Sequence, residues 1–366
     1  MFQLQYFPKL YENLMCNREC SMSRSKKRVT IYDIAKDVNL SPTTVYRALN
    51  GKGRIKSLTQ SIILESANRM GYRANLAASS MSRKTIKIGV VFDLYFPGFH
   101  DGIIAEMRDT FDELYDFKIE AVFAPLDKVY DKNVQINKLK SIARDVNAII
   151  FSPWSSDEAY IDFIDTCESR NLPIFTLIND IPHSKRTGTI GTNSNMTGSV
   201  GAQLLMMLGS TSGNALFVSN KDILNQNELM HGFINRLKMT GNVPIGVYET
   251  QNDDRMGYYL TDKLLKDQPN ISGIFVGISQ SIGVCDRIVE SGLTGRVKLV
   301  CVDIFEKMAE MIESDVVQAT IYQQTKEIGR EAVIAAYDYL VSGRANINVS
   351  LSKPQILIKS NYREYL

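Results

Sequence analysis

Residues 29–53 read VTIYDIAKDVNLSPTTVYRALNGKG, and the spacing of their apolar and capping residues predicts two short helices. Thr30 is a favourable N-cap for a first helix over residues 31–38, in which apolar residues recur at helical spacing. Ser41 is a second N-cap, and Pro42 stands at the first helical position, where its missing N–H costs nothing. Two helices too short to be stable alone, joined by about three residues, are typical of a helix-turn-helix.

A third helix is predicted from about residue 58 to residue 70, and it would complete a three-helix core. The second helix would then expose short hydrogen-bond donors, one aromatic ring and one guanidinium group: Thr43, Thr44, Tyr46, Arg47 and Asn50. A guanidinium group can contact guanine through two hydrogen bonds, and hydroxyls suit bases or phosphate oxygens. This face favours the DNA major groove, with an ordinary solvated face of a small helical bundle as the alternative.

The charge of the chain is divided unevenly along its length, although the formal net charge is only +2. Residues 22–84 hold 13 Lys and Arg against 3 Asp and Glu, whereas residues 85–366 hold 27 against 35. Because phosphate neutralisation requires Lys and Arg, a basic head on an acidic body predicts one end that binds a polyanion. A solvated basic tail is the alternative.

Residues 29–81 resemble, without a gap, the DNA-binding head of the lactose/galactose repressor (LacI/GalR) family of transcriptional regulators. The stretch quoted above and ILESANRMGYRANLAASSM at 63–81 carry this resemblance. It implies that the helix beginning at Pro42 is the recognition helix and that Pro42, Thr43 and Arg47 read bases. Contacts with the phosphate backbone are implied for Thr30, Tyr32, Ser41, Thr44 and Asn50. Tyr46 departs from the family, which usually has Ser there, and we expect it to alter the reading of the operator.

Residues 75–81, NLAASSM, are short and rich in Ala and Ser, and on their own they favour a flexible linker. In the family that the head resembles, this segment folds into a helix on operator DNA beside its copy in a second subunit, and inserts an apolar side chain into the minor groove. The resemblance therefore implies DNA contacts for Asn75, Ala78 and Met81, which stands where the family usually has Leu. It also implies a homodimer on double-stranded operator DNA.

From residue 86 onward, short apolar runs alternate with stretches of helical periodicity. The strand candidates are IKIGVVF, KIEAVF, NAIIFS, PIFTLI, GNALFVS, PIGVYE, SGIFVG and VKLVCVD. Such alternation predicts parallel sheets flanked by helices, and the strands are too many for one compact sheet. We therefore expect two similar lobes, with ligands bound beyond the carboxyl ends of the strands.

The loops that follow these runs hold aromatic, carboxylate and amide side chains. The candidate ligand-binding residues are Phe96, Phe99, Trp154, Asn179, Asp180, Asp303 and Gln323. Aromatic faces stack on the CH-rich faces of sugars, while carboxylates and amides accept hydroxyl protons. The set predicts a small polar effector, a sugar or a sugar derivative, although each residue alone also fits a structural role in its loop.

Residues 173–205 and 297–329 resemble, more loosely, the type I periplasmic-binding-protein-like fold of the same regulators and of ribose-type sugar-binding proteins. This resemblance implies ligand contacts for Asp303 and Gln323. Two departures weaken the expectation of an ordinary pentose or hexose. Leu229 stands where an Arg usually binds the sugar, and FVGISQSIG at 275–283 lacks the usual Asn-Asp pair. The resemblance thus predicts the fold and leaves the identity of the ligand open.

The expected fold class is an all-α helix-turn-helix head joined to an α/β, two-lobed, periplasmic-binding-protein-like effector domain. Residues 1–21 are expected to be an extension that is disordered or precedes a natural start at Met22. The head would span 22–73, a hinge helix and linker 74–84, and the effector-binding and dimerisation domain 85–366.

Other features speak against several classes of protein. The apolar runs are far shorter than the roughly 20 residues of a membrane helix, residues 1–21 lack the features of a secretion signal, and the five cysteines lack CxxC spacing. We expect a cytoplasmic protein without cofactor or metal, and not an enzyme, since HExxH, GxxxxGK[ST] and GxSxG motifs are missing. We interpret the chain as a transcriptional repressor whose affinity for operator DNA is either lowered or raised by the ligand. The alternatives are a solute-binding protein of a transport system and a cleft enzyme of doubly wound fold.

Overall fold

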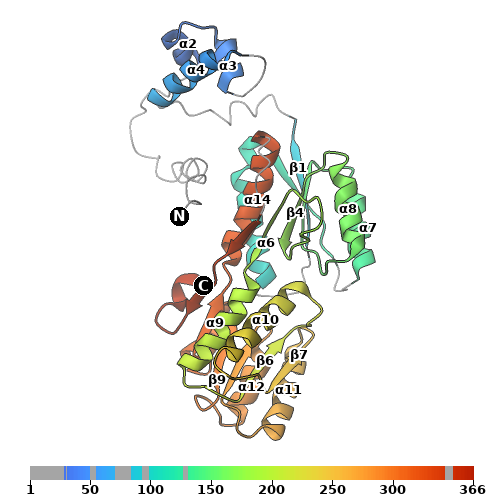
Figure 1. Cartoon of the computed structure of the whole chain (residues 1–366), viewed down its shortest axis with the longest axis vertical. Helices are drawn as coiled ribbons and strands as arrows, with labels where there is room; N and C mark the ends of the chain where they lie inside the picture. The colour runs from blue at the N-terminus through green and yellow to red at the C-terminus, as the bar shows by residue number, and fades with distance from the viewer. Residues whose placement is uncertain are drawn as a thin grey trace. The chain divides into compact units, whose positions relative to one another are not determined.

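The computed structural model describes residues 29, 31–49, 55–70, 84–92, 99–126, 131–342 and 349–366. The chain divides into two compact units, Met1–Lys84 and Thr85–Leu366. The first holds a helical head and the second an α/β body with two sheets, and each unit is described by itself (Figure 1). Within the described ranges, no helix combines the length and apolar character that crossing a bilayer requires.

Three helices form the head: α2 (Ile31–Asp37), α3 (Pro42–Leu49) and α4 (Ser57–Arg69). Their apolar faces meet in a small core of Ile34, Ala35, Val45, Ala48, Ile63 and Ala67. Each helix is too short to be stable alone, so this shared core holds them in place. The predicted three-helix arrangement is confirmed.

Hydrogen bonds between side chains and helix ends fix the head further. Ser41 Oγ accepts a hydrogen bond from the backbone N–H of Thr44 at 3.1 Å, as an N-cap does. Between α2 and α4, Asp37 accepts a hydrogen bond from the Ser66 hydroxyl at 2.5 Å and forms an ion pair with Arg69. The Ser66 hydroxyl and the Arg69 guanidinium hold the pKa of the Asp37 carboxyl below its usual range.

The first lobe of the body is a six-stranded parallel sheet in the order β11-β5-β4-β3-β1-β2. Its strands are β1 (Ile86–Val91), β2 (Ile119–Phe123), β3 (Ala148–Phe151), β4 (Ile174–Ile178), β5 (Gly188–Thr192) and β11 (Val349–Ser352). One face carries α6 (Phe99–Glu113) and α14 (Thr325–Ser342), and the other carries α7 (Lys132–Ile142) and α8 (Glu158–Glu168) (Figure 1). Because helices cover both faces, β3, β4 and β5 are buried along their whole length.

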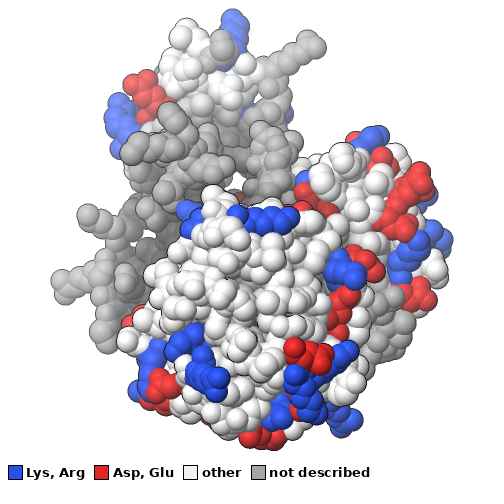
Figure 2. Space-filling model, turned by 60° about the horizontal axis from the view of Figure 1, so that its bottom comes forward, with Lys and Arg blue, Asp and Glu red and all other residues white. Residues whose placement is uncertain are grey.

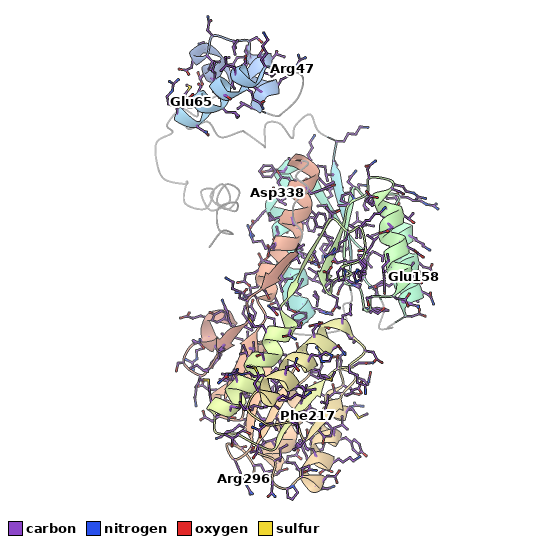
Figure 3. The ribbon with its side chains drawn as sticks, in the orientation of Figure 1. Arg47, Glu65, Glu158, Phe217, Arg296 and Asp338 are labelled. Atoms are coloured by element: carbon purple, nitrogen blue, oxygen red, sulfur yellow. The ribbon has the colours of Figure 1, made fainter. Side chains whose placement is uncertain are left out.

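The second lobe has the same design, with the strand order β12-β10-β9-β8-β6-β7. Its strands are β6 (Asn214–Val218), β7 (Gly246–Glu249), β8 (Gly273–Val276), β9 (Lys298–Val302), β10 (Ala319–Tyr322) and β12 (Gln355–Leu357), of which β12 runs antiparallel to β10. One face carries α9 (Ser194–Met207) and α10 (Leu224–Lys238), and the other carries α11 (Asp254–Asp267), α12 (Ile282–Glu290) and α13 (Glu306–Glu313). Phe217 on β6 is fully buried inside this lobe (Figure 3).

The chain passes between the lobes at three places: between β5 and α9, between β10 and α14, and between β11 and β12. Each lobe is therefore assembled from separate segments of the sequence. Short connections of this kind can act as hinges, because a few residues absorb the change in backbone angles when two lobes reorient.

All eight predicted strands are present, and the expectation of two similar lobes is confirmed. The apolar pattern does not reveal β5, β10, β11 or β12. β5 reads GTIGT, in which small residues replace the apolar run, and β12 has only three residues. Strands of this kind depend on their neighbours in the sheet for burial, so their own sequence signal is weak.

Two glycines allow α9 and α10 to pack backbone against backbone in the second lobe. A Cβ atom at Gly198 would overlap the carbonyl oxygen of Leu229, and a Cβ atom at Gly232 would overlap the carbonyl oxygen of Asn195. This close contact positions α10, whose first turn reaches the space between the lobes.

Gly232→Ala should lower the free energy of unfolding by roughly 1–3 kcal/mol, because the added methyl group forces α10 away from α9. Gly257→Ala in α11 is the matched control: the nearest atom to its Cβ, Val284 Cγ2, lies at an ordinary 3.4 Å. There the gain in helix propensity should leave stability unchanged or raise it by up to about 1 kcal/mol. Urea unfolding of both variants measures the difference, and a Gly232→Ala variant as stable as wild type would contradict the close packing.

Candidate DNA-binding face and ligand cleft

α3 presents the predicted base-reading residues to solvent. One face of α3 is buried in the core of the head, and Pro42, Thr43 and Arg47 on the remaining surface are exposed. Thr43 and Arg47 are four positions apart, so their side chains lie on the same face of the helix. In the view of Figure 3, Arg47 on α3 and Glu65 on α4 lie toward opposite sides of the head. The exposed face therefore offers a hydroxyl and a guanidinium group together, as base reading in a major groove requires.

The residues predicted to contact the phosphate backbone border this face where they are described. Ser41 is exposed, and Thr44 is half-buried with its hydroxyl 2.8 Å from Ser41 Oγ. Tyr32 on α2 is 68% exposed. Outside the described residues lie the side chain of Tyr46 and the residues Thr30, Asn50, Asn75, Ala78 and Met81.

Charges of both signs lie side by side on the face of the molecule shown in Figure 2, with wide uncharged surface between them. Such neighbours in the body include the ion pairs of Lys266 with Asp262 at 2.7 Å and Lys307 with Glu310 at 2.7 Å. Opposite charges this close largely cancel each other at longer range, and salt screens the remainder beyond about 8 Å at physiological ionic strength, so such pairs contribute little attraction for a polyanion. The excess of Lys and Arg over Asp and Glu in residues 22–84 gives this part of the chain a net positive charge, which attracts a polyanion.

A cleft lies between the two lobes of the body, at the carboxyl ends of their strands. Its cavity volume is about 80 Å³, and the surrounding space opens to solvent. The first lobe contributes residues that follow β3 and β4 and the start of α6. The second lobe contributes residues that follow β6, β8, β9 and β10 and the first turn of α10. This is the position at which ligands bind in open α/β sheets.

The second lobe places the Asp303 carboxyl in this cleft. Asp303 follows β9 with a φ of +62°, in the left-handed region, and is buried. It accepts hydrogen bonds from Ser279 Oγ at 2.8 Å and from Gln323 Nε2 at 3.1 and 3.2 Å. Burial raises the pKa of the Asp303 carboxyl to about 6, although the hydrogen bonds from Ser279 and Gln323 oppose the rise. At pH 7.5 the group is therefore largely an ionised hydrogen-bond acceptor.

Asn179 joins the two lobes across the cleft. Its Nδ2 donates a hydrogen bond to the backbone carbonyl of Pro153 at 2.8 Å, within its own lobe. Its Oδ1 accepts a hydrogen bond from the backbone N–H of Asn225 at 2.9 Å, at the start of α10 in the other lobe. The preceding residue, Ile178, has a φ of +66°, which is unfavourable for a β-branched side chain. Asn179 is thus both a lining residue of the cleft and a tie between the lobes.

The structure brings five of the seven candidate ligand-binding residues to the cleft: Phe99, Trp154, Asn179, Asp303 and Gln323. The candidate role of Asp180 needs correction, because its carboxylate forms an ion pair with Arg186, whose Nη2 donates to Oδ2 at 2.7 Å. Asn179 lines the cleft, and Asp180 is not among the lining residues. Phe96 lies outside the described residues.

The structure shows where the two departures from the family pattern, Leu229 and the segment at 275–283, lie relative to the cleft. Leu229 is 2% exposed and packs into the core of the second lobe with Leu216, Phe233 and Phe275. It adds no polar group to the cleft. In the segment that lacks the Asn-Asp pair, Ser279 donates the hydrogen bond to Asp303 described above.

Sequence reasoning missed several polar residues of the cleft. Gln226 on α10 is buried; its Oε1 accepts from the backbone N–H of Ser219 at 3.0 Å, and its Nε2 donates to the Gly277 carbonyl at 3.3 Å. Further lining residues are His100, Ser152, Ser219, Asn225, Asn252, Ser279 and Gln280. Ser219 is the last residue of one predicted strand and Ser279 follows another, so the strand-end rule could have found them. Asn225 and Gln226 lie on a helix that only the packing of the second lobe brings to the cleft.

Sequence comparison assigns both units of the chain. Residues 30–75 match the family described as "Bacterial regulatory proteins, lacI family". Residues 88–345, more than half of the chain, match the family described as "Periplasmic binding protein domain".

Two relatives are named catabolite control protein A. The protein of Priestia megaterium is 25% identical over 273 residues, which cover 72% of this chain and 79% of that protein. The protein of Streptococcus mutans is 36% identical over 129 residues, which cover 34% of this chain and 36% of that protein. The HTH-type transcriptional regulator DegA of Bacillus subtilis is 27% identical over 157 residues, or 42% of this chain and 45% of that protein.

Solved structures share the fold of the body. The glucose-galactose binding protein GanP from Geobacillus stearothermophilus has a TM-score of 0.69 at 16% identity and covers 76% of this chain and 99% of its own. A solute binding protein from Burkholderia graminis, in complex with D-arabinose, has a TM-score of 0.70 at 18% identity and covers 77% of this chain and 98% of its own. With the helix-turn-helix head in front of this body, the chain belongs to the lacI family of bacterial regulatory proteins.

Proposed function

We propose that this regulator binds operator DNA through α3 and that a small polar ligand in the cleft, a sugar or a sugar derivative, changes its operator affinity. The observation that carries the proposal is the presence in one chain of the exposed Thr43–Arg47 face and of a cleft lined by aromatic and polar side chains. The alternative function, a solute-binding protein of a transport system, would explain the fold of the body and would not explain the helix-turn-helix head.

We propose that the regulator binds DNA as a homodimer. One head presents few side chains to bases, so a single copy has little capacity to select a sequence. A two-fold pair of heads matches a pseudo-palindromic operator, in which the half-sites repeat with the symmetry of the protein. The dimer surface should lie on the body.

Two features of the cleft and the comparisons with known proteins support a sugar-like ligand. Phe99 and Trp154 supply aromatic faces, on which CH-rich ring faces stack. Asp303 and Gln323 form a buried pair that can accept and donate hydrogen bonds to hydroxyl groups. Two relatives are named catabolite control protein A, one similar solved structure is a glucose-galactose binding protein, and another is a solute binding protein in complex with D-arabinose.

The coupling to DNA would arise from the orientation of the lobes. A ligand held by Asp303 of the second lobe and Phe99 or Trp154 of the first makes different contacts when the lobes reorient. Only such a difference can shift an equilibrium between two arrangements. A coupling free energy of about 1–3 kcal/mol would change operator affinity roughly 5- to 150-fold.

Arg47→Ala should remove the preference for operator over random DNA and leave weak, salt-dependent binding. The loss should be about 1–3 kcal/mol for each half-site, because a guanidinium group that reads a base contributes on this scale. Lys56→Ala, which removes an exposed cation outside α3, should weaken specific and random binding alike. Competition titrations measure the ratio of the two affinities. A ratio unchanged by Arg47→Ala would show that α3 is not the recognition helix.

Asp303→Ala should abolish the effect of ligand on operator binding and spare operator binding itself. A thermal-shift panel of D-glucose, D-galactose, D-arabinose, D-allose and myo-inositol, the compounds named with similar solved structures, first identifies a ligand. Operator titrations with and without it then compare wild type, Asp303→Ala and the control Glu310→Ala, an exposed carboxylate outside the cleft. A ligand that binds the body tightly and leaves operator affinity unchanged in wild type would contradict the proposed function.

A further inference from the structure

The Asp303 carboxylate is buried among partners that carry no formal charge. Its hydrogen bonds come from the Ser279 hydroxyl and from the side-chain amide and backbone N–H of Gln323, and the Thr320 hydroxyl donates to its backbone carbonyl at 2.6 Å. These groups stabilise a negative charge by their dipoles and do not neutralise it. A carboxylate has about four acceptor positions, so Asp303 retains capacity for a donor from a ligand.

Asp303 is the one Asp, Glu, Lys or Arg in the described lining of the cleft. Amides dominate, with Asn225, Gln226 and Gln280 from the second lobe, and hydroxyls, aromatic rings and the His100 imidazole complete the lining. The residue where related regulators usually bring a guanidinium group, Leu229, is packed in the core instead. The described lining holds neither Lys nor Arg.

These surroundings treat ligands of different charge unequally. A phosphate or carboxylate in the cleft would lose its hydration close to Asp303 and meet no Lys or Arg among the described lining residues, so both desolvation and repulsion oppose it. A hydroxyl group donates to the Asp303 carboxylate without this cost, and a protonated amine also compensates its charge. Phe99 and Trp154 line the cleft, and aromatic rings can stack on a CH-rich ring face or bind a cation.

We propose, as a refinement that rests on the proposed function, that the cleft selects a ring ligand offering a hydroxyl or protonated amine to Asp303 and excludes the phosphorylated form of that ligand. Asp303 is then the residue that sets the charge of the accepted effector.

The test compares ligands that share a ring and differ in charge. Isothermal titration of the full-length chain at pH 7.5 and fixed ionic strength uses D-glucose, D-glucosamine and D-glucose 6-phosphate, and the same three forms of D-galactose. For at least one ring, the neutral or amino form should bind roughly tenfold or more tightly than the 6-phosphate. In D303N this discrimination should fall by about the same factor, because the amide keeps the shape of the side chain and loses the charge. E310Q, which neutralises an exposed carboxylate outside the cleft, should leave the ratio unchanged.

A gain-of-function variant keeps the inference testable if D303N fails to fold. Gln280→Lys brings a cation to the half-buried lining of the cleft and should raise the affinity for the 6-phosphate relative to the neutral sugar by roughly tenfold. Binding of a 6-phosphate as tightly as its neutral form in wild type would overturn the inference, and an operator response to that phosphate would leave the proposed function standing. If none of the six compounds binds in titration or changes operator affinity, the result would contradict both the proposed response to a sugar and this inference.

Discussion

The hydrogen bond from the backbone N–H of Asn225 to Asn179 Oδ1, 2.9 Å long, connects the two lobes at the cleft. On one side, Asn179 is anchored to the Pro153 carbonyl and follows Ile178, whose left-handed backbone costs of order 1–3 kcal/mol. The fully buried strand β4 holds that backbone in place. On the other side, α10 presents Asn225 because glycines let α10 pack directly on α9. The constraints of both lobes therefore meet at one amide side chain.

The residues that would recognise a ligand also stabilise the arrangement of the second lobe. Asp303 holds Ser279 from the β8 loop and Gln323 from the end of β10, close to where the chain crosses back into the first lobe at α14. A ligand that donates to Asp303 acts on this network directly. In this account, the charge of Asp303 selects the ligand, and the ties around it convert binding into a change of lobe orientation.

Much of this architecture is predictable from local sequence because its causes are local. The caps and apolar spacing of residues 31–49 specify α2 and α3, and apolar runs specify eight of the strands. β5 escapes prediction because GTIGT owes its burial to its neighbours. The strand-end rule finds Asn179 and Asp303, yet it cannot decide that Asp180, one residue further, pairs with Arg186. Gln226 is beyond sequence reasoning, since only the packing of α9 against α10 brings it to the cleft.

The most direct test of a link between lobe orientation and DNA binding is the operator affinity of Asn179→Ala in the absence of ligand. Small-angle scattering of the same sample reports the separation of the lobes. The variant loses both hydrogen bonds of the amide, so the lobes should reorient and operator affinity should shift by about fivefold or more, with a smaller response to added ligand. If scattering shows that the lobe separation of the variant has changed, and its operator affinity and ligand response still equal those of wild type, the account is contradicted.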